Sequence, residues 1–346
     1  MHKKQSVVRK VLLSVASIFS LIAILIAGFI TSERAETVEH SVIQQIKIST
    51  QIASSGIHEF FRERSRVVTS LQTNTFVNDW FNDYKNRGSN IDGDEDYQQI
   101  VQLFKNTSQQ DPMIKSMFYA PAATHEYFDI NGRYNDPNYS TDKRPWWGVA
   151  LGKDRLFITN PEIDANDKSI VTSIKSTVYN SYGTLLGVIG IDILASEIKS
   201  GLIEKMKFDN LGHGFLYSND GQIISFPDRN NRIDMSKLPK LSVVDNTIEN
   251  ASGFASLMQA ASRNDETLSY VTFNGESHIV YVKAIKDEKL ELDWRLGFMV
   301  PEHVITEPVN DAIFYSIVMV ILVILVTSFV IVFTIQKLLT TPLNKI

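Results

Sequence analysis

The sequence has 346 residues, no cysteine, and a formal net charge of −5 from 34 Lys and Arg and 39 Asp and Glu residues. The lack of cysteine excludes a disulfide framework, thiolate metal sites and a cysteine nucleophile. It also fits an oxidising compartment, in which a free thiol would be a liability.

Two uncharged apolar runs lie near the ends of the chain, at residues 11–31 and 312–335. Each is long enough to cross a bilayer as a helix, which takes about 20 residues. The first run could also be a cleavable signal peptide, but it exceeds the length of a signal-peptide apolar region, so we expect an uncleaved anchor. Lys and Arg precede the first run and Lys follows the second, so the positive-inside rule places residues 1–10 and 336–346 in the cytoplasm.

The segment between the two runs is acidic and is expected to lie on the non-cytoplasmic side of the membrane. Six of the 34 Lys and Arg residues lie beyond residues 32–311, which leaves 28 against all 39 Asp and Glu residues and a net charge of −11. Affinity for nucleic acid depends on clustered Lys and Arg. We therefore expect no nucleic-acid partner.

Residues 32–72 are predicted to form one long helix. They contain no proline and one glycine, and apolar residues such as Val38, Val42 and Ile46 recur at helical spacing. A core helix of a globular domain is the alternative. The length favours a stalk that pairs with a second copy of the chain, so a homodimer is expected.

Residues 73–207 are expected to form a first module. Two helices, at 74–85 and 97–107, precede short β-branched and apolar runs separated by turns, which predict an antiparallel sheet. These runs cover residues 114–119, 125–130, 156–159, 170–178 and 185–193. A helix is predicted to follow at 193–207, with Asp192 as a candidate N-cap.

Residues 208–310 predict a second, smaller module. Asn219-Asp-Gly221 between two alternating apolar runs is a strong hairpin signal, and three further strands are expected at 268–273, 278–285 and 294–300. A helix opening at Pro301 then leads into the second apolar run.

Four motifs in this order resemble the double Cache sensor of bacterial transmembrane receptors, of the chemoreceptor or sensor diguanylate cyclase type. They are Lys143-Arg-Pro-Trp-Trp147, Gly187-Val-Ile-Gly-Ile-Asp192, the hairpin at 214–228, and Asp293 to Pro301. The resemblance covers about residues 33–310 and implies an α+β fold, in which a long N-terminal stalk helix and two PAS-like antiparallel sheet modules are flanked by two transmembrane helices.

Residues 336–346 resemble the start of a HAMP linker. We expect either a truncated receptor or one whose output module lies on another polypeptide.

The resemblance also implies a ligand site in the first module. In the amino-acid-binding subset of the family, the matching positions are Tyr139, Arg144, Trp146, Trp147, Glu162 and Asp192, of which Trp147 and Glu162 replace an expected Tyr. Tyr119, or its neighbour Phe118, and Phe157 are expected to line the same pocket, although strand alternation lets only one of Phe118 and Tyr119 face it.

The chemistry of an α-amino acid suits these residues. Arg144 offers a planar bidentate donor for the carboxylate, and Asp192 with the aromatic rings suits the ammonium. Glu162 adds a negative charge, which predicts either a more cationic ligand or a Glu162–Arg144 pair that competes with the ligand.

Each residue also has a purely structural interpretation. Arg144 could anchor its loop, and Asp192 could serve as a helix cap with no ligand role. Glu162 could be a solvated surface carboxylate. At least one of Trp146 and Trp147 is expected in the core.

The sequence carries no signature of catalysis or of a bound metal. Its seven His residues show no zinc-binding spacing, and there is no G-x-S-x-G elbow or phosphate loop. We therefore expect a non-enzymatic sensor of a small amino acid or amine, without cofactor or metal. The alternatives are a protein-docking module with a degenerate pocket, the sensor of a cyclase or histidine kinase, and an extracellular hydrolase.

Overall fold

The computed structural model describes residues 2–164, 166–206 and 211–335, with only the backbone described for residues 2–9, 11–13 and 335. The chain divides into two compact units, residues 1–45 with 302–346, and residues 46–301. The predicted linker at 336–346 and the predicted module boundary at 207/208 lie outside the described residues.

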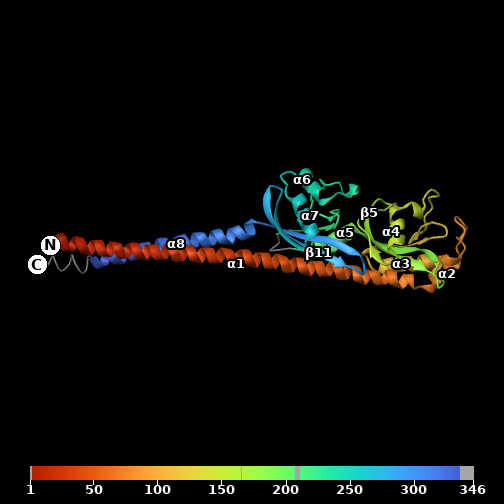
Figure 1. The fold of residues 1–346 in the computed structure, drawn as a ribbon, viewed down its shortest axis with the longest axis horizontal. Coiled ribbons are helices and arrows are strands. Elements are labelled where there is room, and N and C mark those ends of the chain that lie inside the picture. The colour runs from red at the N-terminus through yellow and green to blue at the C-terminus, as the bar shows by residue number, and fades with distance from the viewer. Residues whose placement is uncertain (1, 165, 207–210, 336–346) are drawn as a thin grey trace. The chain divides into compact units, whose positions relative to one another are not determined.

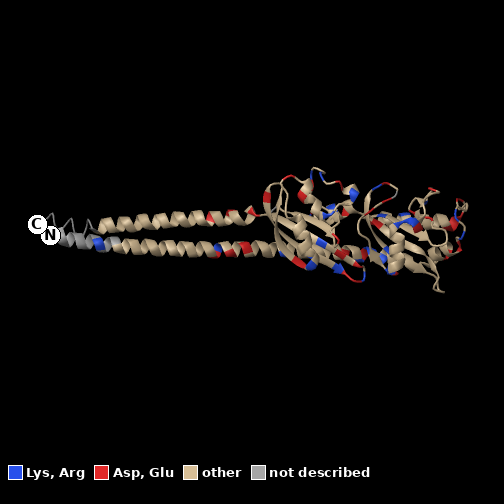
Figure 2. Ribbon diagram, turned by 45° about the horizontal axis from the view of Figure 1, so that its top comes forward, with Lys and Arg blue, Asp and Glu red and all other residues tan. Residues whose placement is uncertain are grey.

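The first unit consists of two long helices. They are the N-terminal part of α1 (His2–Gln72) and α8 (His303–Ile335), which lie side by side (Figure 1). Both helices are long and apolar enough to cross a membrane. Thr31 Oγ1 donates to Ser316 Oγ at 3.0 Å between them. Figure 2 shows uncharged stretches along both helices, and their large apolar side chains are exposed, as expected of a surface that lipid covers.

In the second unit, the C-terminal part of α1 packs against both modules. Ile46, Ile57, Phe61 and Val68 are completely buried and recur at helical spacing, so they form one buried face. Phe61 meets Trp294 edge to face, with ring centroids 5.1 Å apart. Gln72 Nε2 donates to Thr177 O at 2.9 Å. The predicted stalk is thus the continuation of the first apolar helix, without a break.

The first predicted module is called the distal module below, and the second the proximal module. The distal module, residues 73–206, holds a seven-stranded antiparallel sheet in the order β3-β2-β1-β7-β6-β4, with β5 also paired to β6. Asn74 and Asp94 cap its first two helices through Val77 N and Tyr97 N. Its elements are α2 (Thr75–Asp83), α3 (Glu95–Gln110), β1 (Ile114–Pro121), β2 (Phe128–Asp129), β3 (Gly132–Arg133), η1 (Thr141–Lys143), α4 (Pro145–Lys153), β4 (Phe157–Ile158), β5 (Glu162–Ile163), β6 (Ile170–Tyr179), β7 (Leu185–Leu194), α5 (Ala195–Ile198) and the π-helical turn η2 (Lys199–Ile203).

The proximal module, residues 211–301, holds a five-stranded antiparallel sheet in the order β10-β11-β12-β8-β9. Its core gathers aromatic and aliphatic residues of the strands and of α7, among them Phe215, Phe254 and Phe273. Its elements are β8 (His213–Ser218), β9 (Ile223–Ser225), η3 (Met235–Lys237), η4 (Leu241–Val243), α6 (Val244–Thr247), α7 (Phe254–Arg263), β10 (Glu266–Phe273), β11 (Glu276–Asp287) and β12 (Leu292–Pro301).

The α+β architecture is therefore confirmed, while the helix predicted at 193–207 begins later, at Ala195, and its predicted cap is wrong. Asp192 does not cap a helix, because β7 continues to Leu194 and Asp192 pairs with Ser116 and Ser173 inside the sheet. The β-branched residues Ile191 and Ile193 on either side of it are completely buried, and their burial favours the strand.

Candidate functional site

A cavity of about 330 Å³ lies in the distal module, beside the central strands and the start of α4. Side chains reach it from β1, β5, β6 and β7 and from the loops around them. The residues lining it are Phe118, Tyr127, Tyr139, Arg144, Pro145, Trp146, Pro161, Glu162, Ile163, Asp164, Asn166, Val171, Lys175, Asp192 and Leu238.

Five of the sequence-predicted residues meet at this cavity: Tyr139, Arg144, Trp146, Glu162 and Asp192. They come from segments up to 53 residues apart in the sequence, and the antiparallel sheet brings them together. Their contact with a ligand stays a prediction.

Three predicted residues lie elsewhere than expected. Trp147 and Phe157 belong to a small apolar core with Ala120, Ala150 and Val188. Tyr119 stacks on Phe81 of α2, with ring centroids 3.8 Å apart, while its strand neighbour Phe118 lines the cavity. The alternation along β1 permits only one of the two to face the cavity, and the packing of α2 on the other face decides which.

Arg144 occupies the position immediately before α4, whose first residue is Pro145. Its guanidinium carbon lies 5.5 Å from the centre of the Tyr139 ring. Among the described residues no carboxylate lies within ion-pair distance of Arg144, and its buried Nε has no hydrogen-bond partner. A guanidinium without an ion-pair partner, beside the positive end of a helix, is suited to bind the carboxylate of a ligand.

Asp192 lies on the central strand β7 and is only 6% exposed. Ser173 Oγ donates to Oδ1 at 2.5 Å and the Tyr127 hydroxyl donates to Oδ2 at 3.3 Å. Burial raises the pKa of Asp192 to about 6, although nearby Lys175 and the Ser173 hydrogen bond act to lower that pKa. Above that pH the residue is a buried carboxylate, and no Lys, Arg or His among the described residues forms an ion pair with it.

Lys175 is the one cation among the described lining residues that the sequence motifs did not point to. It is 2% exposed on β6, its Nζ donates to Glu162 Oε2 at 2.8 Å, and it lies 4.8 Å from the centre of the Trp146 ring. Glu162 therefore pairs with Lys175 and not with Arg144. A signal for Lys175 is present in the sequence, because it is the only charged residue of residues 170–179. It lies two residues after Ser173, and therefore on the sheet face that Ser173 shares with Asp192.

The third carboxylate of the cavity, Asp164, also has an ion-pair partner. Lys115 Nζ donates to Asp164 at 2.6 Å and to Asp167 at 2.8 Å. With Glu162 and Asp164 both paired, the charges left without an ion-pair partner are the cation of Arg144 and the anion of Asp192. The cavity thus presents one positive and one negative group.

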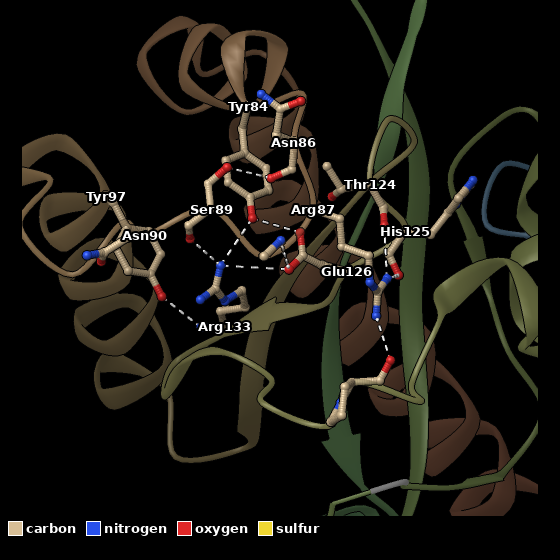
Figure 3. A network of polar contacts seen from close by, with 12 residues as sticks. Tyr84, Asn86, Arg87, Ser89, Asn90, Tyr97, Thr124, His125, Glu126 and Arg133 are labelled. Atoms are coloured by element: carbon tan, nitrogen blue, oxygen red, sulfur yellow. Dashed lines mark hydrogen bonds and ion pairs between the residues drawn. The ribbon is translucent and has the colours of Figure 1, made fainter.

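A polar network fixes the loop that carries Tyr139. Arg87 donates to the carbonyl oxygens of Tyr139 at 2.6 Å and of Thr124 at 3.0 Å. In the same network (Figure 3), the buried carboxylate of Glu126 accepts a 2.8 Å bond from the Tyr84 hydroxyl, which also accepts a 3.2 Å bond from Arg133. Arg87 therefore positions the Tyr139 segment without reaching the cavity itself.

Comparison with known proteins agrees with this architecture. Residues 32–309 match the Cache domain family dCache_1. The methyl-accepting chemotaxis protein PctB of Pseudomonas aeruginosa is 25% identical over 200 residues, which are 56% of this chain and 28% of PctB. McpA of Pseudomonas putida is 30% identical over 91 residues, or 26% of this chain and 14% of McpA. The chain thus spans less than a third of the length of these relatives.

Two solved structures share the fold. The ligand-binding domain of PctB in complex with L-Arg superposes with a TM-score of 0.56 at 19% identity, covering 76% of this chain and 97% of that domain. The ligand-binding domain of the Pseudomonas fluorescens chemoreceptor CtaA in complex with L-alanine gives 0.54 at 18% identity, covering 75% and 96%.

Proposed function

The chain belongs to the Cache domain family, and on that premise we propose that it is the ligand-sensing part of a bacterial chemoreceptor-type membrane receptor, with a small amino acid bound in the distal cavity. The receptor is not an enzyme in this proposal. Its two apolar helices support insertion in the inner membrane, with residues 32–311 on the outer side.

The observation that carries the proposal is the pair of uncompensated charges in the cavity. An amino acid is a zwitterion, so its carboxylate suits Arg144 and its ammonium suits the ionised Asp192. The rings of Tyr139, Trp146 and Tyr127 line the same space and offer faces to the ammonium. A cavity of about 330 Å³ lies in the range of small-ligand sites.

The Lys175–Glu162 pair narrows the ligand class. Glu162 suggested a more cationic ligand from the sequence, but Lys175 balances its charge at 2.8 Å. The lining groups left without an ion-pair partner among the described residues are then one cation, Arg144, and one anion, Asp192, which supports a ligand whose amino and carboxyl groups are its only charges. L-alanine, named with the CtaA structure, belongs to this ligand class, whereas L-Arg, named with the PctB structure, carries a further positive charge.

A thermal-shift screen of the full chain in nanodiscs, with the proteinogenic amino acids and simple amines, tests the proposal. A ligand at 100 times its Kd stabilises the folded state by about 2.7 kcal/mol. We expect at least one amino acid to raise the Tm of the wild type, Arg144→Ala to abolish the rise, and the exposed matched control Arg263→Ala to retain it. The proposal fails if no compound shifts the wild type or if Arg144→Ala keeps the full response.

A homodimer through α1 is part of the same proposal. Ile48 and Ile52 are 58% and 68% exposed and lie one helical turn apart on α1, where a second copy could cover them. Since the chain has no cysteine, a single Ile52→Cys substitution is a clean probe. We expect oxidative crosslinking into a dimer at that position and none for Tyr182→Cys, on an exposed turn of the distal module. Equal crosslinking at both positions would contradict the stalk interface.

A further inference from the structure

One side chain that lines the distal cavity comes from the proximal module. Leu238 follows η3 and shares the cavity lining with Arg144, Glu162 and Asp192. It is the only described lining residue from beyond β7. It is also not a member of the apolar core of its own module, so it lines the distal cavity and does not pack in that core.

The backbone of Leu238 adopts a conformation that leucine rarely takes. Its φ of 50° and ψ of 57° lie in the left-handed region, and the next residue is Pro239, which disfavours helical backbone before it. The Leu238 N–H donates to Met235 O at 3.0 Å, and Pro239 O accepts from Ile223 N at 2.8 Å. Strained backbone of this kind persists where its surroundings fix it, and it is enriched at ligand clamps.

Polar contacts join this part of the proximal module to the rim of the cavity. Gln222 Nε2 donates to Pro161 O at 3.1 Å, directly before β5, and Gln222 pairs in an antiparallel bridge with Lys240. Asn160 Nδ2 donates to Asp220 Oδ1 at 3.2 Å. The hairpin β8–β9 and the Leu238 segment are therefore tied to the chain that leads into β5, which carries the cavity residues Glu162 and Ile163.

We propose that Leu238 determines ligand specificity by closing the distal cavity against the side chain of the bound amino acid. The inference rests on the proposed amino-acid binding. Arg144 and Asp192 hold the two charged groups of the ligand, and the rest of the lining includes three aliphatic residues, Ile163, Val171 and Leu238, that suit an apolar ligand side chain. That lining selects an aliphatic side chain. Because Leu238 belongs to the proximal module, the distal site is complete only with both modules in contact.

Calorimetric titration of the full chain in nanodiscs with L-leucine and with L-alanine tests the role of Leu238. Leu238→Gly removes the side chain and suits the left-handed backbone, so it keeps the fold. We expect it to weaken L-leucine binding about tenfold or more and L-alanine binding less than threefold, because only the longer side chain loses its contact. Leu268→Ala, at an exposed leucine of β10 in the same module, should change neither affinity.

A second variant tests whether a loss of affinity comes from a folding defect. Leu238→Asn also tolerates the left-handed backbone and keeps a similar size, but it places an amide at the cavity. It should lower the affinity for L-leucine with an unchanged Tm in the absence of ligand.

Four outcomes would contradict this inference in whole or in part. Equal loss for L-alanine and L-leucine, or no loss for either, rejects the specificity role while the proposed function stands. A wild type that binds other amino acids but neither of these two rejects the aliphatic selection alone. A wild type that binds no amino acid rejects this inference and the proposed function together.

Discussion

Replacing Asp192 with asparagine should stabilise the ligand-free protein at alkaline pH while it weakens ligand binding. Asparagine has almost the shape of aspartate and retains an oxygen that can accept the bond from Ser173 Oγ, which lies 2.5 Å from Asp192. It lacks the charge that is buried on β7. The expected gain in the free energy of unfolding comes only from removing that charge.

The pKa of Asp192 gives the size of the effect. It is raised from 3.8 to about 6 by burial. Between these pH values the folded state holds a proton that the unfolded state has released, so stability falls as pH rises through this range. One pKa unit corresponds to about 1.4 kcal/mol, so the ionised carboxylate costs the folded protein roughly 3 kcal/mol above pH 6. Below about pH 4 both states are protonated and the cost disappears.

Thermal unfolding of the full chain in nanodiscs at pH 8 and pH 4 measures this cost. Since 1 kcal/mol moves the Tm of a domain of this size by about 2–4 °C, Asp192→Asn should raise the Tm at pH 8 by roughly 6–12 °C and leave it nearly unchanged at pH 4. The exposed control Asp83→Asn should stay within about 0.5 kcal/mol of the wild type at both pH values. A variant less stable than the wild type at pH 8, or an equal shift at both pH values, would refute the reasoning.

The same geometry leads to three further expectations. Ligand affinity should fall about tenfold per pH unit below pH 6 in calorimetric titrations, because protonated Asp192 no longer attracts the ammonium; a flat profile would remove Asp192 from the site. Lys175→Met should lower the Tm because Glu162 loses its 2.8 Å partner, and adding Glu162→Gln should restore most of the lost Tm. If the two substitutions change the Tm additively, the pairing is contradicted. Arg87→Ala should weaken binding several-fold by freeing the Tyr139 segment, with the remaining affinity still lost on protonation of Asp192; unchanged affinity would show that the network does not position the loop.

The strands and the main cavity residues could be predicted from the sequence because each depends on a local pattern of residues. Alternating β-branched residues define β6 and β7, and the motif around Arg144 and the end of the Gly187 strand are each local patterns. Arg144, directly before α4, and Asp192, on β7, both line the cavity, as the family resemblance of these two motifs implied.

Other features depend on register and packing that no local pattern specifies. Lys175 reaches Glu162 because β5 pairs with β6 in the register Glu162 to Val171. Tyr119 faces away from the cavity because Phe81 of α2 stacks on it. Leu238 reaches the cavity from the other module through a left-handed backbone that the sequence Leu-Pro does not suggest.

The central claim is that the cavity recognises both charged groups of an amino acid, and one set of titrations tests it most directly. The amino acid found in the screen is compared with its deaminated and decarboxylated analogues on the wild type, Arg144→Ala and Asp192→Asn. We predict that each analogue binds the wild type at least about 100-fold more weakly, as loss of a charge-assisted contact in a partly buried site implies. Arg144→Ala should erase the preference over the decarboxylated analogue, and Asp192→Asn the preference over the deaminated one. An amine or an acid that alone binds as tightly as the amino acid would contradict the claim.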